Sequence, residues 1–178
     1  MIRKFTSAFR RLIRDESGSA SVEFVLIFPL YLSFILMSIE LGFVTMRHTL
    51  LERGLDIAVR EVRLGTGTAP QHDEIKALVC DNAVMVLNCK EKLKLEMRPA
   101  DIFALNTLDT TPDCTDKAEP TKPVRTFEPG TANQLMLMRA CYKYEPFFPE
   151  EFLGSALQKD GSGEAKIVSM TAFVQEPN

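Results

Sequence analysis

A run of 25 residues at positions 22–46 limits what this chain can fold into more than any other feature. Its only charged side chains are Glu23 and Glu40. At 1.5 Å per residue, a helix of this length crosses the hydrocarbon core of a bilayer. An ionised carboxylate at the edge of such a span costs about 2.5–3.5 kcal/mol, so Glu23 is expected to have a partner.

The charges outside the run predict its orientation. The first 18 residues hold five of the 21 basic side chains and two of the 24 acidic ones, a net charge of +3. The rest of the chain carries a net charge of −6. Because basic flanks stay in the cytoplasm, we expect a single pass through the inner membrane, with the acidic C-terminal part in the periplasm. This charge gives no support for nucleic-acid binding.

Pattern and composition divide the chain into four segments. These are a basic leader (1–18), a transmembrane helix (19–46), an amphipathic extension of that helix (47–64) and a periplasmic domain (71–178). The extension is predicted because apolar residues recur there at helical spacing, at Leu51, Leu55, Ala58 and Val62. A chain of 178 residues has room for one modest domain beside the span, which argues against a large enzyme architecture.

The domain is expected to have an α+β fold with an antiparallel sheet. Its expected helices cover residues 73–87 and 150–159, and its strands 92–98, 134–144 and 166–174. Apolar and charged residues alternate in the first strand, which predicts one buried face and one open face. Residues 105–132 are rich in proline and threonine and are interpreted as a long irregular loop.

Four cysteines, Cys80, Cys89, Cys114 and Cys141, lie in the part expected to be periplasmic. An even number in that compartment favours disulfides over four reduced thiols, and the wide spacing disfavours a zinc site. Three connectivities are possible, of which we favour Cys80–Cys89 with Cys114–Cys141. The first bond requires the helix to end before Cys89, because nine helical residues span about 13 Å and a disulfide needs Cα atoms within roughly 7 Å.

Small residues precede the apolar run instead of following it. A secretory signal would place its small-residue cleavage site after the apolar core. Here Gly18 and Ser19 stand before the core, so a cut on the cytoplasmic side would leave the span attached to the mature protein. Gly18, followed at the fifth position by Glu23 and then by Phe24, resembles a prepilin peptidase site.

More narrowly, residues 14–30 and the following Ile39-Glu-Leu-Gly42 resemble the TadE-like family, minor pseudopilins of the Tad (Flp) tight-adherence pilus machinery. The resemblance implies a pilin-like fold and a processing site at Gly18, Ser19, Glu23 and Phe24. No catalytic, cofactor or metal site is expected, because the sequence shows no enzyme motif. The resemblance also implies three kinds of partner besides the lipid bilayer: a prepilin peptidase, other Tad pilins and pseudopilins, and an inner-membrane assembly platform.

Cleavage after Gly18 would expose the amine of Ser19 as a cation. This amine could pair with Glu23 of the same or a neighbouring subunit within a bundle of apolar helices, and so set the register between subunits. The alternative is an unprocessed, signal-anchored periplasmic binding or scaffold protein, in which Glu23 is solvated at the cytoplasmic interface.

Two further residues of the run are candidates for assembly contacts. Glu40 lies 17 residues beyond Glu23, about 25 Å along a helix, and is expected near the outer interface. There it could contact another subunit or simply reach headgroups and water. Pro29 could bend the helix during assembly, although prolines are ordinarily tolerated in such helices.

The remaining polar and aromatic residues favour structural interpretations. The two histidines, His48 and His72, lie far apart with no nucleophile or metal motif near them, and each is expected at the surface. A cluster of aromatic residues could form an adhesive or partner surface, but a packed sheet face is favoured. Its members are Tyr142, Tyr144, Phe147 and Phe148.

Overall fold

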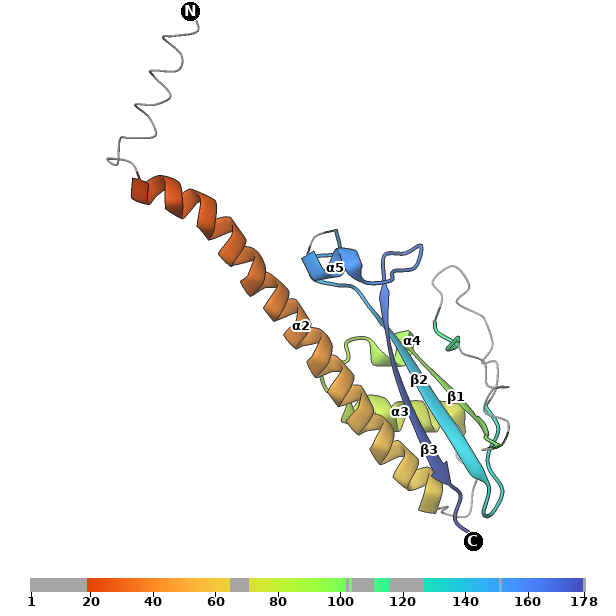
Figure 1. The fold of residues 1–178 in the computed structure, drawn as a ribbon. Coiled ribbons are helices and arrows are strands. Elements are labelled where there is room, and N and C mark those ends of the chain that lie inside the picture. Colours follow the sequence, from red (N-terminus) through yellow and green to blue (C-terminus); the bar gives the residue numbers. More distant parts are fainter. Residues whose placement is uncertain are drawn as a thin grey trace, which may run out of the picture. The chain divides into compact units, whose positions relative to one another are not determined.

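The computed structural model describes residues 19–64, 71–101, 103, 111–115, 127–150 and 152–177 (Figure 1). The elements in chain order are α2 (Ser19–Leu64), α3 (His72–Asn82), α4 (Cys89–Lys92), β1 (Leu93–Pro99), β2 (Leu135–Tyr144), α5 (Phe152–Ala156) and β3 (Ala165–Val174). The chain divides into two compact units, Met1–Ile39 and Glu40–Asn178, with α2 running from the first into the second. The leader and Gly18 lie outside the described residues.

In the first unit the described residues form the N-terminal part of α2. Apolar side chains are exposed here on every side of the helix, since residues 24–28 are consecutive and all exposed. Pro29 lies inside the helix without ending it. The Ser33 hydroxyl donates to the Leu30 carbonyl at 2.7 Å and the Ser38 hydroxyl to the Phe34 carbonyl at 2.7 Å, so these polar groups are satisfied within the helix.

By length and composition α2 is able to cross a membrane, and none of its most apolar window is buried. The core helix of a soluble protein would bury such a window. The expected long apolar helix is therefore present, and its side chains are free to contact lipid or other helices.

The second unit is built on a three-stranded antiparallel sheet in the order β1-β2-β3. Leu95 of β1 pairs with Ala140 of β2, which pairs in turn with Ser169 of β3. The three strands agree with the predicted ones to within one residue at each end. The expected α+β fold with an antiparallel sheet is confirmed.

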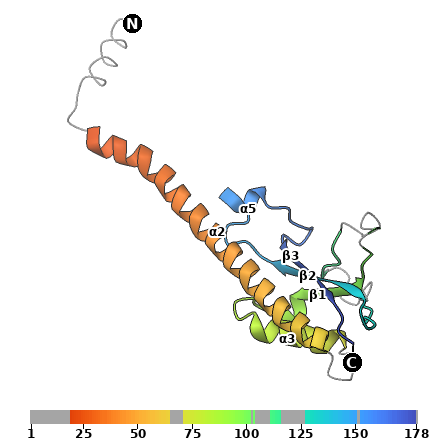
Figure 2. The same ribbon diagram turned by 60° about the horizontal axis from the view of Figure 1, so that its bottom comes forward.

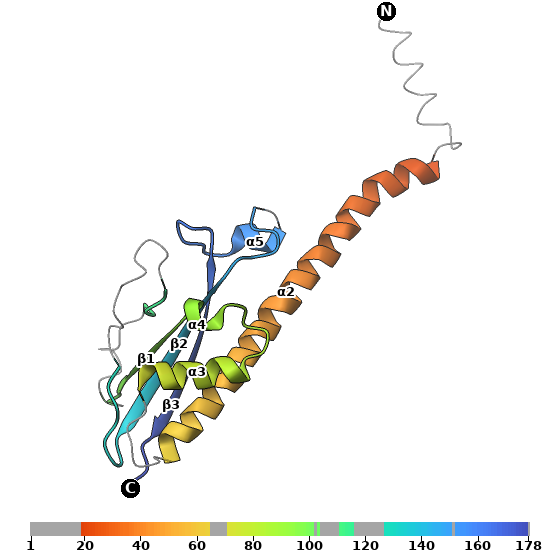
Figure 3. The same ribbon diagram turned by 180° about the vertical axis from the view of Figure 1, so that it is seen from behind.

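One face of the sheet and the C-terminal half of α2 enclose the core. The stripe predicted for residues 47–64 is buried: Leu51, Leu55, Ala58 and Val62 are each at most 4% exposed. Helix α3 lies beside the same stretch of α2 (Figures 2 and 3). The two helices meet at Gly54, where an added Cβ would lie 2.6 Å from the Val79 carbonyl oxygen, so only glycine fits without a shift.

The prediction that β1 has an open face is wrong. Lys94 and Glu96, on the charged side of the strand, are each 7% exposed. Residues 111–115 cover them: Lys94 Nζ lies 3.0 Å from a carboxylate oxygen of Asp113, whose backbone N–H donates to Glu96. Arg139 Nε of β2 donates to the second Glu96 oxygen at 2.7 Å. The charged side is therefore a buried layer of paired charges.

Both predicted helices of the domain are shorter than expected. Helix α3 ends at Asn82 instead of residue 87, and the chain then turns until Asn88, which adopts a left-handed conformation with φ of 53° before α4. Helix α5 covers only Phe152–Ala156 of the expected 150–159. In the predicted loop 105–132, residues 111–115 and 127–132 are described, and they contain no helix or extended strand beyond a bridge from Phe127 to Met97.

Candidate functional site

Two parts of α2 carry the residues singled out by the sequence. In the first unit, Glu23 is the only charged residue between Ala20 and Ile39, and it is exposed among apolar side chains. Phe24 beside it is 61% exposed, and its ring stacks on Phe28 at 4.9 Å between centroids.

Glu40, in the second unit, is held by the chain's own domain. Its side chain is 1% exposed, and Oε1 accepts a hydrogen bond of 3.5 Å from the backbone N–H of Phe148. The other oxygen, Oε2, is buried with no hydrogen-bond partner among the described residues. From its place in the sequence, Glu40 was expected at another subunit, at lipid headgroups or in water; the contact within the chain was not predicted.

Arg47 lies two helical turns beyond Glu40 on the same face of α2 and is 8% exposed. Its guanidinium carbon is 5.2 Å from the ring centroid of Tyr144 and 5.3 Å from that of Phe147, distances typical of cation–π contacts. Burial raises the pKa of the Tyr144 hydroxyl, Arg47 partly lowers it and Glu40 raises it further. The domain-facing side of α2 thus carries a buried acidic and a buried basic residue ahead of its fully buried apolar residues, which begin at Leu51.

The aromatic residues singled out near the end of β2 lie in two different environments. Tyr142 and Tyr144 are 2% and 3% exposed, so the expected packed sheet face is confirmed for both tyrosines. Phe147 lies beyond the end of β2 and remains 53% exposed, although its ring packs on Phe43 at 4.9 Å between centroids. The pattern of the sequence did not distinguish these two environments.

The cysteines pair as Cys80–Cys89 and Cys114–Cys141, with Cα separations of 5.6 and 5.2 Å. This is the connectivity favoured from the sequence. The first bond forms because α3 ends at Asn82, well before Cys89. The second fastens residues 111–115 to β2, which keeps the paired charges on β1 covered.

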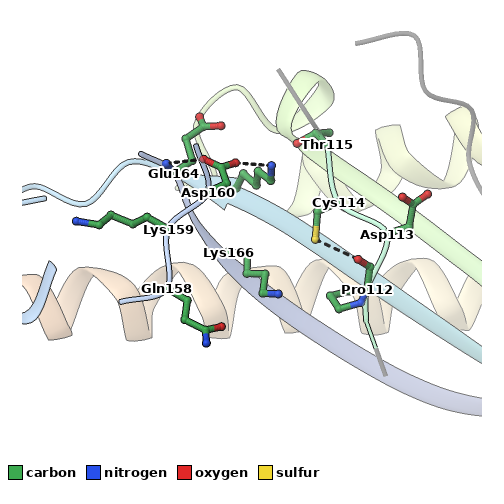
Figure 4. A pocket seen from close by; sticks show the side chains of 10 residues that line it. Pro112, Asp113, Cys114, Thr115, Gln158, Lys159, Asp160, Glu164 and Lys166 are labelled. Atoms are coloured by element: carbon green, nitrogen blue, oxygen red, sulfur yellow. Dashed lines mark hydrogen bonds and ion pairs between the residues drawn. The ribbon is translucent and has the colours of Figure 1, made fainter. Parts of the chain in front are cut away.

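A hollow of about 540 Å³ lies between residues 111–115 and the connection from β2 to β3 (Figure 4). Asp160 lines this hollow. One of its carboxylate oxygens contacts Lys143 Nζ at 2.5 Å. The other oxygen accepts hydrogen bonds from the backbone N–H groups of Ser162 and Glu164 at 2.9 and 3.1 Å. Burial raises the pKa of the Asp160 carboxyl, but the hydrogen bonds from Lys143 and Ser162 lower it by more, leaving it well below its usual value. These contacts stabilise a turn.

The structure offers little support for chemistry at the histidines. His48 lies on the surface, 3.6 Å from Glu52. His72 is more buried than expected, with a side chain 18% exposed, and its ring meets Phe127 edge-on at 5.2 Å. Within the described ranges, no group of three or more His, Cys, Asp or Glu residues is placed to hold a metal ion.

Comparison with known proteins supports the interpretation of α2. Residues 18–60 match the model of the TadE-like protein family, which confirms the resemblance inferred from the sequence. The matched segment includes Glu23, Pro29, Glu40 and Arg47, and it ends before α3 begins. No curated protein and no solved structure is significantly similar to the chain.

Proposed function

We propose that this chain, TadE-like over residues 18–60, is a non-enzymatic minor pseudopilin-like subunit that takes part in assembling or priming a Tad (Flp)-type adhesive pilus. The observation that carries the proposal is the family match to a helix whose apolar side chains are exposed on all sides. A helix of this kind is suited to lie in lipid and then to join a bundle of similar helices.

The proposal assigns a maturation step to the start of this helix. A prepilin peptidase would remove residues 1–18 and leave Ser19 as the new N-terminus. Its amine would lie one helical turn before Glu23, about 6 Å along the axis. Surrounded by apolar helices, the amine and the carboxylate would attract each other far more strongly than in water. The pair could form within one subunit or between neighbours, and in the second case it would fix their axial register.

The topology follows from charge and length. Residues 20–39, which precede the first residue covered by the domain, would span about 30 Å as a helix, close to the thickness of the hydrocarbon core. The basic leader favours a cytoplasmic N-terminus. The domain would then lie in the periplasm, an oxidising compartment in which its two disulfides are stable.

The domain would serve as the head of the subunit, presented to other pilins, pseudopilins and the inner-membrane assembly platform. Its sheet and the C-terminal half of α2 share one core, and two disulfides cross-link it. Because the family match ends at residue 60, the domain supplies the part of the surface that would distinguish this subunit from its siblings.

The test of the maturation step is a substitution at the cleavage site. The chain is expressed with and without a prepilin peptidase, as wild type and as Gly18→Val, and the mass of the membrane-extracted protein is measured. The peptidase should shorten the wild type by the leader and leave Gly18→Val intact, because a branched side chain before the scissile bond obstructs entry of the backbone.

Gly42→Val is the matched control, since nothing lies within 4 Å of a Cβ added at Gly42. This variant should be shortened as the wild type is. A shortened Gly18→Val protein would refute the assignment of the site. A wild type that keeps residues 1–18 in the presence of the peptidase would favour the unprocessed signal anchor instead.

A further inference from the structure

The loop after β2 packs on α2 at the first residues of the second unit. Ile39 and Leu41 are exposed, whereas Glu40 between them is covered by the domain. What covers it is the loop of residues 145–149, through the hydrogen bond from Phe148 N–H. If residues 20–39 lie in lipid, anything packed on Glu40 and Phe43 lies within about one helical turn of the membrane surface.

The 145–149 loop is fixed in place by contacts on several sides. Besides the bond to Glu40, the backbone carbonyl of Pro149 accepts a hydrogen bond from Lys159 Nζ. A Cβ at Gly154 of α5 would collide with the Phe148 carbonyl oxygen, so the glycine allows the backbone of α5 to pack directly on the loop. The position of the loop relative to Glu40 is therefore built into the domain.

The exposed part of the loop is apolar. Its sequence is Glu145-Pro-Phe-Phe-Pro149, and Phe147 shows 53% of its surface even though Phe43 and Arg47 flank its ring. The loop leaves the Phe147 ring half open about one to two helical turns beyond Ile39, and it presents the kind of apolar side chain that interfacial segments insert between headgroups.

We propose that the 145–149 loop is a membrane-contact element that places the ring of Phe147 in the outer interfacial region of the bilayer. This inference rests on the proposed function to the extent that residues 20–39 must span a membrane. Lipid is favoured over a protein partner because the loop packs on Glu40 and Phe43, which follow within about one helical turn of the segment that would lie in lipid.

Charges of both signs surround the loop. Glu145 and Glu150 are exposed, but Lys92 Nζ lies 4.0 Å from a Glu145 carboxylate oxygen, and Lys159 Nζ donates to the Pro149 carbonyl. A rim of mixed charge neither strongly attracts nor strongly repels a lipid surface, so zwitterionic lipid is a suitable probe. Contact would therefore depend on insertion of the ring, and it would neither need anionic lipid nor weaken with added salt.

The full chain lacks tryptophan, so single tryptophans can report on membrane depth. Phe147→Trp is reconstituted in phosphatidylcholine vesicles containing lipid brominated close to the headgroup, which quenches indole fluorescence on contact. Leu32→Trp, measured in vesicles whose lipid is brominated deep in the acyl chain, probes the span, and Met170→Trp, at an exposed site on β3, probes the domain surface. Quenching of Phe147→Trp should be about twofold or more stronger than that of Met170→Trp, since interfacial side chains lie within about 5–10 Å of the headgroup boundary.

The three tryptophan positions distinguish failure of the membrane-contact proposal from failure of the membrane span itself. Quenching at Leu32 but only background quenching at Phe147 would overturn the membrane-contact element and leave the anchor standing. No quenching at Leu32 would remove the span, and with it both the proposed function and this inference. A blue-shifted but unquenched Phe147→Trp would show that protein covers the ring, which also overturns the inference.

Discussion

Single residues decide how closely the elements of this domain approach one another. At Gly54 the backbone of α2 meets the Val79 carbonyl of α3, and a methyl group would lie 2.6 Å from that oxygen. Glu40 and Arg47 show the same dependence on position, since both are polar residues buried where the helix meets a loop more than 90 residues later in the chain. Their environment depends on which residues pack there, and the residue type alone does not predict it.

Gly54→Ala should destabilise the domain by about 1–3 kcal/mol, because the packed helices must separate to admit the methyl group. Gly42→Ala is the control: its added Cβ meets nothing within 4 Å, and alanine favours a helix by up to about 1 kcal/mol. Thermal unfolding of the full chain in detergent micelles, followed by circular dichroism, compares the two variants. Equal melting temperatures would contradict the close packing at Gly54.

Asp160 should make the domain sensitive to acid. Its folded-state pKa lies below the unfolded value of about 3.9, so its stabilising contribution is present above that pH and is lost as the pH falls towards the folded pKa. Asp160→Asn should cost about 1 kcal/mol at pH 7, because solvent screens part of the attraction at this partly exposed carboxylate, and the difference from wild type should shrink towards pH 2. Melting temperatures measured across this range test the prediction.

Asp81→Asn is the comparison for Asp160, because the Asp81 carboxylate is 68% exposed and 3.9 Å from Lys90. Removing such a surface pair should change stability by less than about 1 kcal/mol at any pH. A constant difference between Asp160→Asn and wild type from pH 7 to pH 2 would show that the charge of Asp160 does not stabilise the turn.

Among the elements, the disulfides fasten segments that lie outside the three-stranded sheet. Cys114–Cys141 closes a loop with a sequence separation of 27, and Cys80–Cys89 one of 9. The first also keeps residues 111–115 over the charged side of β1. The second bridges the turn between α3 and α4.

Two double variants, each with both cysteines of one disulfide replaced by alanine, show how much each disulfide contributes to the stability of the domain. From loop length, the loss of Cys114–Cys141 should cost about 4 kcal/mol and the loss of Cys80–Cys89 about 3 kcal/mol. Chemical denaturation of both double variants under the same conditions measures the difference. The account of the covered β1 face would be wrong if removing Cys80–Cys89 proved the more damaging change.

The spacing of apolar residues along the chain predicted the helix and strand positions that depend on neighbouring residues. Helical spacing identified the buried stripe of α2, and alternation identified the strands to within one residue. Alternation failed for the environment of β1, because the cover over Lys94 and Glu96 comes from a distant segment. The favoured Cys114–Cys141 bond placed that segment next to β2, so it was the signal that could have revealed the cover.

Glu40 was singled out from the sequence, but its surroundings were not predicted. A carboxylate near the end of an apolar run is compatible with water, lipid headgroups or another subunit. The structure instead buries it under Phe148, which the chain supplies 108 residues later. No periodic pattern near Glu40 encodes such a contact, and the same holds for the rings on either side of Arg47.

In the whole molecule, we expect Glu23 to act in assembly and Glu40 in folding. Glu23→Gln should be processed as the wild type is, but should lower the yield of pili about tenfold or more, which corresponds to at least about 1.4 kcal/mol lost from subunit association. The measurement is pilus yield by electron microscopy, in parallel with the mass of the membrane-bound subunit. Pili in normal number would show that the charge of Glu23 is dispensable.

Glu40→Gln is the matched control for this experiment, because an amide retains the oxygen that accepts from Phe148 N–H. This variant should remain folded and support close to normal numbers of pili. A greater loss of pili with Glu40→Gln than with Glu23→Gln would reverse the two assignments.

The most direct test of the central claim is the N-terminal sequence of the protein extracted from membranes of cells that contain a prepilin peptidase. We predict that the mature chain begins at Ser19, with its amine one helical turn from Glu23. A chain that begins at Met1 and retains the basic leader would contradict the proposed maturation and the assembly role built on it.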